Sequence, residues 1–308
     1  MAQTLLQLCQ QASREMGIAA PATIIINTAQ LAVSLLNLIN GVGQQLVTEH
    51  EWQKLDIEYR FTTVFYEYTA NQTADSVNLT ALSSATGLTT NPTYFGVTGN
   101  GINQDTYLAT IDGGALTATL SQAATQTITA NPLTFAQIRY AFPADFDRMV
   151  DRTYWDKSKN WQIYGPETGQ QWQWLKSGFS ATGPVYRFRQ LGGLFQIWPP
   201  LNADDYVGFE YISNYWVATS ASAAGSKTAF TVDTDVCLFP DRLMIDGLKY
   251  RFAEQQGLER TPMYEKAWRR QLDIAKAADA GAATLSMAPR PASVLLNWWN
   301  IPDSGLGS

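Results

Sequence analysis

The chain has 308 residues and a formal net charge of −6, with 45% hydrophobic and 16% charged residues. A chain of this length buries at least one sizeable core and suggests about two domains. The acidic balance argues against a protein that coats DNA, because coating requires basic residues that neutralise phosphates, but it permits a surface that DNA slides past.

Two helices are expected in the N-terminal part. Residues 4–17 open with the capping box Thr-Leu-Leu-Gln, carry one apolar face and end in glycine. A second apolar stripe predicts a helix from about residue 27 to about His50. Gly41 and Gly43 weaken this helix, which indicates close helix packing or a bend.

A change in composition then sets one segment apart. No Lys or Arg occurs between Arg60 and Arg139, and within this gap the chain is rich in Thr, Ala, Gly, Asn and Ser with short apolar alternations. We expect residues 69–132 to form a small β module, inserted into a loop of a host core made of residues 1–68 and 133–281.

The middle of the host core is expected to be a β layer. Alternation predicts strands within 52–68 and 138–142, and Pro143-Ala144-Asp145 predicts a short helix that runs to about Asp156. Further strands are expected at 161–164, 185–190, 194–198 and 206–213, with a hairpin turn at 191–193.

Helices return in the C-terminal part. Asp241 is expected to cap a helix that ends at Gly257, and Thr261-Pro262 to open a last helix that ends at Gly281. Residues 282–308 contain three prolines and predict an extended arm. The expected fold class is therefore α+β, with a helical bundle from both chain ends, a β layer in the middle and the inserted β module.

Side chains for catalysis or metal binding are scarce. His50 is the single histidine, and its place near a helix end predicts a surface or capping role. Cys9 and Cys237 lie far apart and are expected to be buried thiols. These residues provide neither a zinc-type cluster nor a hydrolase triad, so we predict no enzyme, no cofactor and no metal.

Other candidate motifs have simpler explanations. The paired carboxylates Asp145/Asp147 and Asp204-Asp205 would serve a metal-dependent hydrolase, but a helix start and a turn account for them. Gly99-Asn100-Gly101 is expected to be a turn. The start of the chain lacks the pattern of a signal peptide, and the chain contains no run of about 18 apolar residues. We therefore predict neither a signal peptide nor a membrane span.

The host segments contain a series of short sequence blocks. They are residues 4–10, 14–18, 51–55, 140–148, 155–158, 165–167, 171–172, 209–213 and 229–235. In order and spacing, these blocks resemble head-to-tail adaptor (connector) proteins of short-tailed bacteriophages.

Within the predicted insert, three short blocks resemble the Ig-like β modules that phages splice into structural proteins. They are residues 97–102, 108–112 and 120–125. The resemblance implies an Ig-like fold for the insert and assigns it no role.

The adaptor resemblance implies a structural virion protein in the tail or neck, assembled in the host cytoplasm. Such proteins form a homo-oligomeric ring, usually of twelve copies, that joins the portal protein to the tail nozzle protein. Genomic DNA passes through the channel without sequence-specific binding, no membrane is involved, and the C-terminal arm reaches into the portal.

Candidate assembly residues lie in the arm and on the last helix. Apolar side chains in an extended segment are typical anchors, although the arm has the alternative of folding back on its own subunit. The candidates are Leu295, Leu296, Trp298, Trp299, Ile301, Arg269 and Arg270. The alternative functions are another phage tail or decoration protein, or a surface module that binds glycan.

Overall fold

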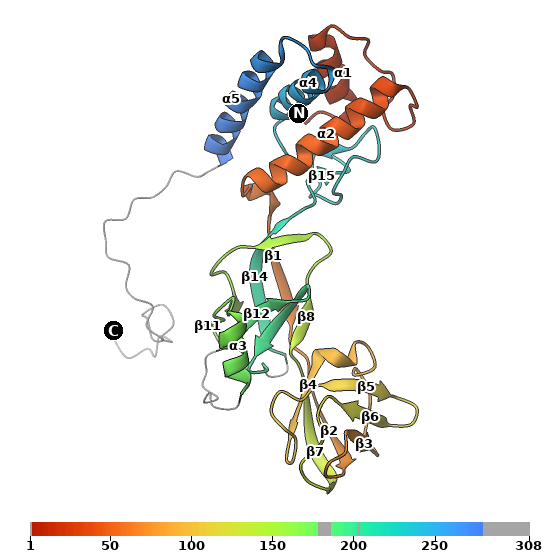
Figure 1. Cartoon of the computed structure of the whole chain (residues 1–308), viewed down its shortest axis with the longest axis vertical. Coiled ribbons are helices and arrows are strands. Elements are labelled where there is room, and N and C mark those ends of the chain that lie inside the picture. The colour runs from red at the N-terminus through yellow and green to blue at the C-terminus, as the bar shows by residue number, and fades with distance from the viewer. Residues whose placement is uncertain (1, 178–185, 202–203, 280–308) are drawn as a thin grey trace, which may run out of the picture. The chain divides into compact units, whose positions relative to one another are not determined.

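A computed structural model gives the fold and describes residues 2–177, 186–201 and 204–279 (Figure 1). Its helices are α1 (Leu5–Met16), α2 (Gln30–Glu49), α3 (Gly169–Lys176), α4 (Asp241–Gln256) and α5 (Thr261–Asp279). Its strands are β1 (Asp56–Thr62), β2 (Phe65–Gln72), β3 (Asn78–Thr80), β4 (Phe95–Gly99), β5 (Leu108–Asp112), β6 (Thr117–Leu120), β7 (Ile128–Gln137), β8 (Arg139–Ala141), β9 (Phe146–Met149), β10 (Trp155–Asp156), β11 (Trp161–Gln162), β12 (Arg187–Leu191), β13 (Leu194–Trp198), β14 (Tyr206–Ser213), β15 (Val217–Ala218) and β16 (Val236–Cys237).

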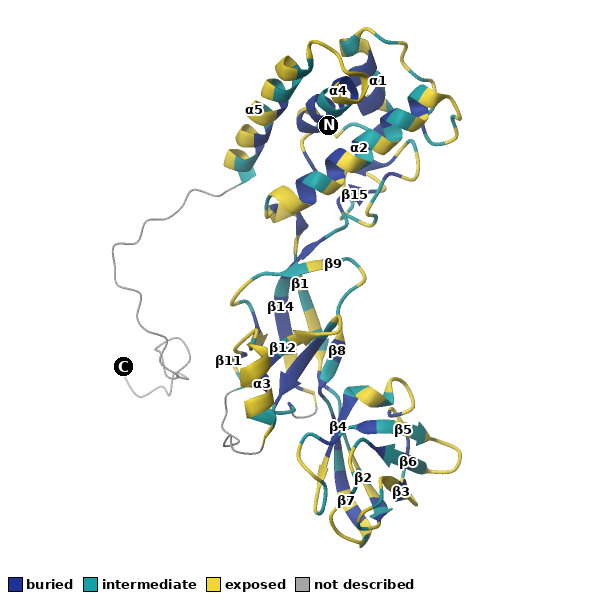
Figure 2. Cartoon of the chain, in the orientation of Figure 1, coloured by how far each residue is buried: buried dark blue, intermediate teal, exposed yellow. Residues whose placement is uncertain are grey.

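The chain divides into two compact units. Unit 1 comprises Met1–Ile57, Asp145–Met149 and Tyr211–Ser308, and unit 2 comprises Glu58–Ala144 and Val150–Glu210. Each unit therefore combines segments that are far apart in the sequence, and each has its own buried residues (Figure 2).

In unit 1, α4 is the central helix and contacts α1, α2 and α5. Its Gly247 makes this possible, because a side chain there would meet Val42 of α2 and Trp268 of α5 at 2.7 and 3.0 Å. The capping box that the sequence predicts for α1 is present, with the amide of Gln7 donating to Thr4. Unit 1 also contains the two-stranded sheet β15–β16.

A polar network fixes the loop that precedes α4. The carboxylate of Asp235 accepts hydrogen bonds from Lys227 Nζ at 2.8 and 2.9 Å and from the amides of Thr231 and Val232 at 2.9 Å each. Burial by itself raises the pKa of Asp235, but these donors outweigh it, so the pKa is lowered from its ordinary value. The carbonyl of Asp235 accepts the amide of Leu5 at 2.8 Å, which ties α1 to this loop.

Unit 2 contains an aromatic core and a distinct β module. In the core, Tyr154, Phe188, Phe195 and Phe209 are buried, and the rings of Tyr154 and Phe188 lie 4.0 Å apart. The hairpin β12–β13 turns through Gly192 and Gly193, both at positive φ, which confirms the predicted turn.

The β module is one six-stranded sheet in the order β4-β7-β2-β3-β6-β5. Its two outermost strands approach each other, since Gly96 forms a bridge with Tyr107 and the amide of Val97 donates to the carbonyl of Thr106 at 2.8 Å. The module has its own core. The buried residues of this core are Ala70, Leu79, Leu82, Leu88, Phe95, Val97, Leu108, Ala118, Leu120, Leu133 and Phe135.

The expected fold class is wrong. Helix and strand make nearly equal contributions, 30% and 29%. The strands form several sheets rather than one layer, and the described residues do not show a helical bundle from both chain ends. Periodicity identifies an apolar helix face but not the element that covers it. Gly43 of α2, for example, packs against Trp216, a residue that belongs to no helix. The Ig-like expectation also needs correction, because an Ig fold has two facing sheets and this module has one continuous path of six strands.

Two local predictions are also corrected, and one helix is additional. The predicted helix after Pro143 is absent, and this segment forms β9 and β10. The cap of α4 is Pro240 rather than Asp241, whose carboxylate accepts the amide of Gln3 at 3.1 and 3.2 Å instead. Helix α3 was not expected, although Thr168 and Gln171 form a capping box.

Among the described residues, α2 alone is long and apolar enough to cross a membrane, with a mean hydropathy of 1.2. The core helix of a soluble protein passes the same test, and α2 contacts α4 through a buried stripe. The stripe consists of Ala32, Leu35, Ile39, Val42, Gly43, Leu46 and Val47. The absence of a membrane partner remains a prediction.

Candidate assembly surface

Helix α5 is held to unit 1 by one face. Trp268, Leu272 and Ala275 are buried, and the Trp268 ring stacks on Tyr250 of α4 at a centroid distance of 5.4 Å. In Figure 2 the side of α5 toward α4 is buried, and the opposite side is exposed. Within the described ranges α5 packs through one side only, which leaves its outer side available to a partner.

The outer side of α5 carries a second stripe, formed by Met263, Ala267, Arg270 and Ile274. Met263 is 59% exposed and Ile274 is 50% exposed. The spacing of four, three and four residues places all four side chains on one face of the helix. We call these four residues the α5 stripe. Exposed apolar residues that occur singly are ordinary, but their alignment on one helix face is typical of a contact surface.

The structure separates the two arginines that the sequence proposes as assembly residues. Arg269 is 71% exposed and forms an ion pair of 2.6 Å with Glu265, one turn earlier on its own helix. Arg270 belongs to the α5 stripe and forms no ion pair with any residue that the structure describes. The other candidates, Leu295, Leu296, Trp298, Trp299 and Ile301, lie outside the described residues.

The C-terminal end of α5 is fixed to the end of α2. The carboxylate of Asp279 accepts the amide of Gln53 at 3.0 Å and lies 3.5 Å from His50 Nε2. Lys276 pairs with Glu49 at 3.1 Å. The single histidine thus takes part in holding the last described turn of α5 on the end of α2.

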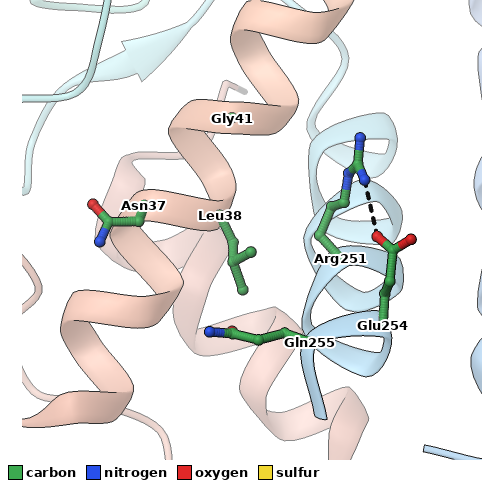
Figure 3. Close-up of a pocket in the computed structure, with 6 residues that line it drawn as sticks. All are labelled: Asn37, Leu38, Gly41, Arg251, Glu254 and Gln255. Atoms are coloured by element: carbon green, nitrogen blue, oxygen red, sulfur yellow. Dashed lines mark hydrogen bonds and ion pairs between the residues drawn. The ribbon is translucent and has the colours of Figure 1, made fainter. Parts of the chain in front are cut away.

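A groove of about 330 Å³ lies between α2 and α4 (Figure 3). Asn37, Leu38 and Gly41 line it from α2, and Arg251, Glu254 and Gln255 line it from α4. Figure 3 shows Arg251 and Glu254 paired along α4, at 2.9 Å. We call this depression the α2–α4 groove.

The two glycines of α2 differ in what surrounds them. A Cβ at Gly43 would lie 2.2 Å from the buried ring of Trp216, so intramolecular packing explains this glycine. A Cβ at Gly41 would meet nothing within 4 Å. Gly41 is exposed and lines the α2–α4 groove, and nothing inside the described chain requires a glycine there.

Ion pairs hold α1 on α4. Glu15 accepts hydrogen bonds from Arg242 at 2.7 Å and from Lys249 at 2.6 Å, and Lys249 also lies 2.7 Å from Asp246. Burial raises the pKa of Glu15, but hydrogen bonds from Lys249, Gln11 and Arg242 reverse the effect and lower it. The network keeps the helices of unit 1 in a fixed arrangement.

Asp145 and Asp205, two of the carboxylates considered for a hydrolase, have structural partners. Asp145 accepts hydrogen bonds from Tyr211 at 2.9 Å and Ser213 at 2.7 Å, and Asp205 pairs with Lys159. No group of three or more His, Cys, Asp or Glu residues that could hold a metal occurs in the described ranges.

The two cysteines are free and buried, as expected. Burial, followed by the charge of Asp233, raises the pKa of Cys9 to about 12, and burial likewise raises that of Cys237 to about 12. Both are therefore protonated thiols at neutral pH, which are poor nucleophiles.

A second depression, of about 370 Å³, lies on the β module. Strands β3, β5 and β6 line it with short polar side chains, including Thr80, Thr110, Thr119 and Asp112. The hydroxyls of Thr110 and Thr119 are 2.6 Å apart, and the amides of Ala115 and Gly114 lower the pKa of Asp112. This face offers hydroxyls and an anionic carboxylate to a ligand.

Comparisons with known proteins add no family to this description. The chain matches no protein-family model, and no curated protein is significantly similar to it. The likeness to phage adaptor proteins therefore rests on the sequence blocks given above and remains a prediction.

Proposed function

We propose that the chain is a non-catalytic structural subunit that assembles with copies of itself into a ring, and that this ring is a head-to-tail adaptor of a virion. The observation that carries the proposal is the pair of different open surfaces on unit 1, the α5 stripe and the α2–α4 groove. Two unlike surfaces on one subunit are what a ring requires, since each copy contacts its two neighbours differently.

The sequence resemblance supplies the partners of this proposal. The ring joins the portal protein to the tail nozzle protein, has about twelve copies, and lets genomic DNA pass without sequence-specific binding. The net charge of −6 supports a channel wall that repels the DNA backbone. The fixed end of α5 supports an arm that starts at the same place on every copy and reaches a partner.

Native mass spectrometry of the full chain, alone and mixed with a portal protein, tests this function. The expected result is a closed ring of about twelve copies, formed by the chain alone or on the portal. A chain that remains monomeric in both samples at high concentration refutes it. A hydrolase activity that survives purification and is abolished by a single substitution also refutes it.

A glycan-binding surface module is a second candidate, favoured by the Thr- and Asp-lined depression of the β module. Hydroxyl and carboxylate groups are suitable partners for sugar hydroxyls. A glycan array on the full chain tests it, with Asp112→Asn and Thr110→Val as matched variants. Binding that both variants abolish supports this function, and the absence of binding by the unmodified chain refutes it.

A further inference from the structure

We infer that the α5 stripe of one copy packs into the α2–α4 groove of the next copy, with Arg270 beside Glu254. This inference rests on the proposed ring and names the residues that make its subunit contact. The occupant of the groove is therefore a second copy of this chain. Three independent features of unit 1 support the pairing.

The first feature is Gly41. Glycine is a poor residue for the middle of a helix, and here no neighbour within the described chain needs the space. The missing side chain leaves the floor of the α2–α4 groove open. Glycine at a helix surface permits the close approach of another element, and none of the described residues supplies that element here.

The second feature is the spacing of the α5 stripe. Residues separated by four, three and four positions form the kind of seam through which one helix packs against others. Met263 and Ile274, at the two ends of the stripe, are each at least half exposed. The other face of α5 is already buried on α4. A helix that has one face covered and a second face with exposed apolar residues at both ends is suited to bridging two subunits.

The third feature is complementary charge. Arg270 has no ionic partner among the described residues, and Glu254 lies on the wall of the groove with its side chain 48% exposed. Glu254 accepts one hydrogen bond from Arg251 and a long one, of 3.4 Å, from Tyr250, which leaves acceptor capacity on its carboxylate. Arg251 also donates to Gln45 at 2.6 Å, so the groove's own cation is held in place.

Charge reversal tests the pairing. We expect Arg270→Glu and Glu254→Arg each to lower the fraction of ring in native mass spectra at least tenfold, and the double variant to regain most of it. Arg269→Glu is the matched control, because it changes the same charge one residue away from the stripe, and it should assemble like the unmodified chain. Equal effects of Arg269→Glu and Arg270→Glu, or no recovery in the double variant, overturn the inference.

Cross-linking tests the geometry. A mixture of Gly41→Cys and Ile274→Cys chains should form a disulfide-linked dimer under mild oxidation, whereas either variant alone should not. Cys9 and Cys237 are buried and do not compete. No cross-linked dimer in the mixture overturns the inference.

The result also separates the inference from the proposed function. If the unmodified chain forms rings that all the variants preserve, the inference fails and the ring function stands. If the unmodified chain forms no ring, alone or with portal, both fail.

Discussion

Replacing Gly43 by alanine should destabilise unit 1, although alanine is the better helix former. The ideal Cβ would lie 2.2, 2.3 and 2.5 Å from three atoms of the Trp216 ring. That ring cannot easily move, because its Nε1 donates to the carbonyl of Thr228 at 2.7 Å and Phe230 lies edge-on at 5.1 Å. Overpacking of this severity costs about 3 kcal/mol. Helix propensity returns about 1 kcal/mol, so the net loss is about 2 kcal/mol.

Gly41→Ala is the internal control, on the same helix two residues away. Because a Cβ there meets nothing, the propensity gain of about 1 kcal/mol should appear in full. Thermal unfolding followed by circular dichroism, at concentrations where the chain is monomeric, measures both. At about 2–4 °C per kcal/mol, Gly43→Ala should lower Tm by roughly 4–8 °C and Gly41→Ala should raise it by roughly 2–4 °C.

The opposite signs are the decisive result. Shifts of the same sign for the two variants would contradict the reasoning, because helix propensity alone affects both glycines equally. A Tm of Gly43→Ala at or above that of the unmodified chain would mean that Trp216 does not pack against α2 as the structure places it.

Three further predictions concern other parts of the chain. The pKa of Asp235 is lowered in the folded state, so its contribution to stability is present above the unfolded pKa of about 3.9 and is lost as pH falls through the folded pKa. Asp235→Asn should lower the free energy of unfolding by about 2 kcal/mol at neutral pH. It should also reduce the loss of stability at acid pH, measured by urea unfolding at a series of pH values. An unchanged loss at acid pH would mean that Asp235 does not cause it. Asn131 is buried and donates hydrogen bonds to Gln72 and to the carbonyl of Asn100. The substitution Asn131→Leu should lower the stability of the β module by about 2 kcal/mol, measured by urea unfolding. A neutral effect would mean that these hydrogen bonds contribute little. Trp298→Ala with Trp299→Ala should leave the circular dichroism of the monomer intact and weaken ring assembly or portal binding at least tenfold; loss of monomer stability with normal assembly would place the arm on its own subunit.

Local signals in the sequence predicted local structure well. The capping box before α1 and the Gly-Gly turn between β12 and β13 are confirmed, because both depend on residues within a few positions of each other. Thr168 and Gln171 form the same kind of capping box before α3, and this pattern would have predicted the helix. Where local signals compete with distant partners they mislead. Asp145 resembles a helix cap, but Tyr211 and Ser213 bind its carboxylate and the segment extends as a strand.

The candidate surface could be predicted only in part. The sequence indicates a packing role for Gly41 and Gly43 and an assembly role for Arg270. Periodicity does not distinguish a glycine that packs against another side chain from one that lies on the surface. That distinction depends on Trp216, which lies far along the chain and reaches α2 only in the folded protein. The overall fold class failed for the same reason, since the partners of an apolar face are set by long-range contacts.

The closed path of the β module has a consequence for crowded assemblies. An open sheet edge presents unpaired amides and carbonyls that recruit strands from other chains. Here the outermost strands β4 and β5 approach each other through Gly96 and Tyr107, so part of that edge is used within the module itself. In the proposed ring, where copies lie close together, this contact leaves less free edge for edge-to-edge pairing between modules of neighbouring copies.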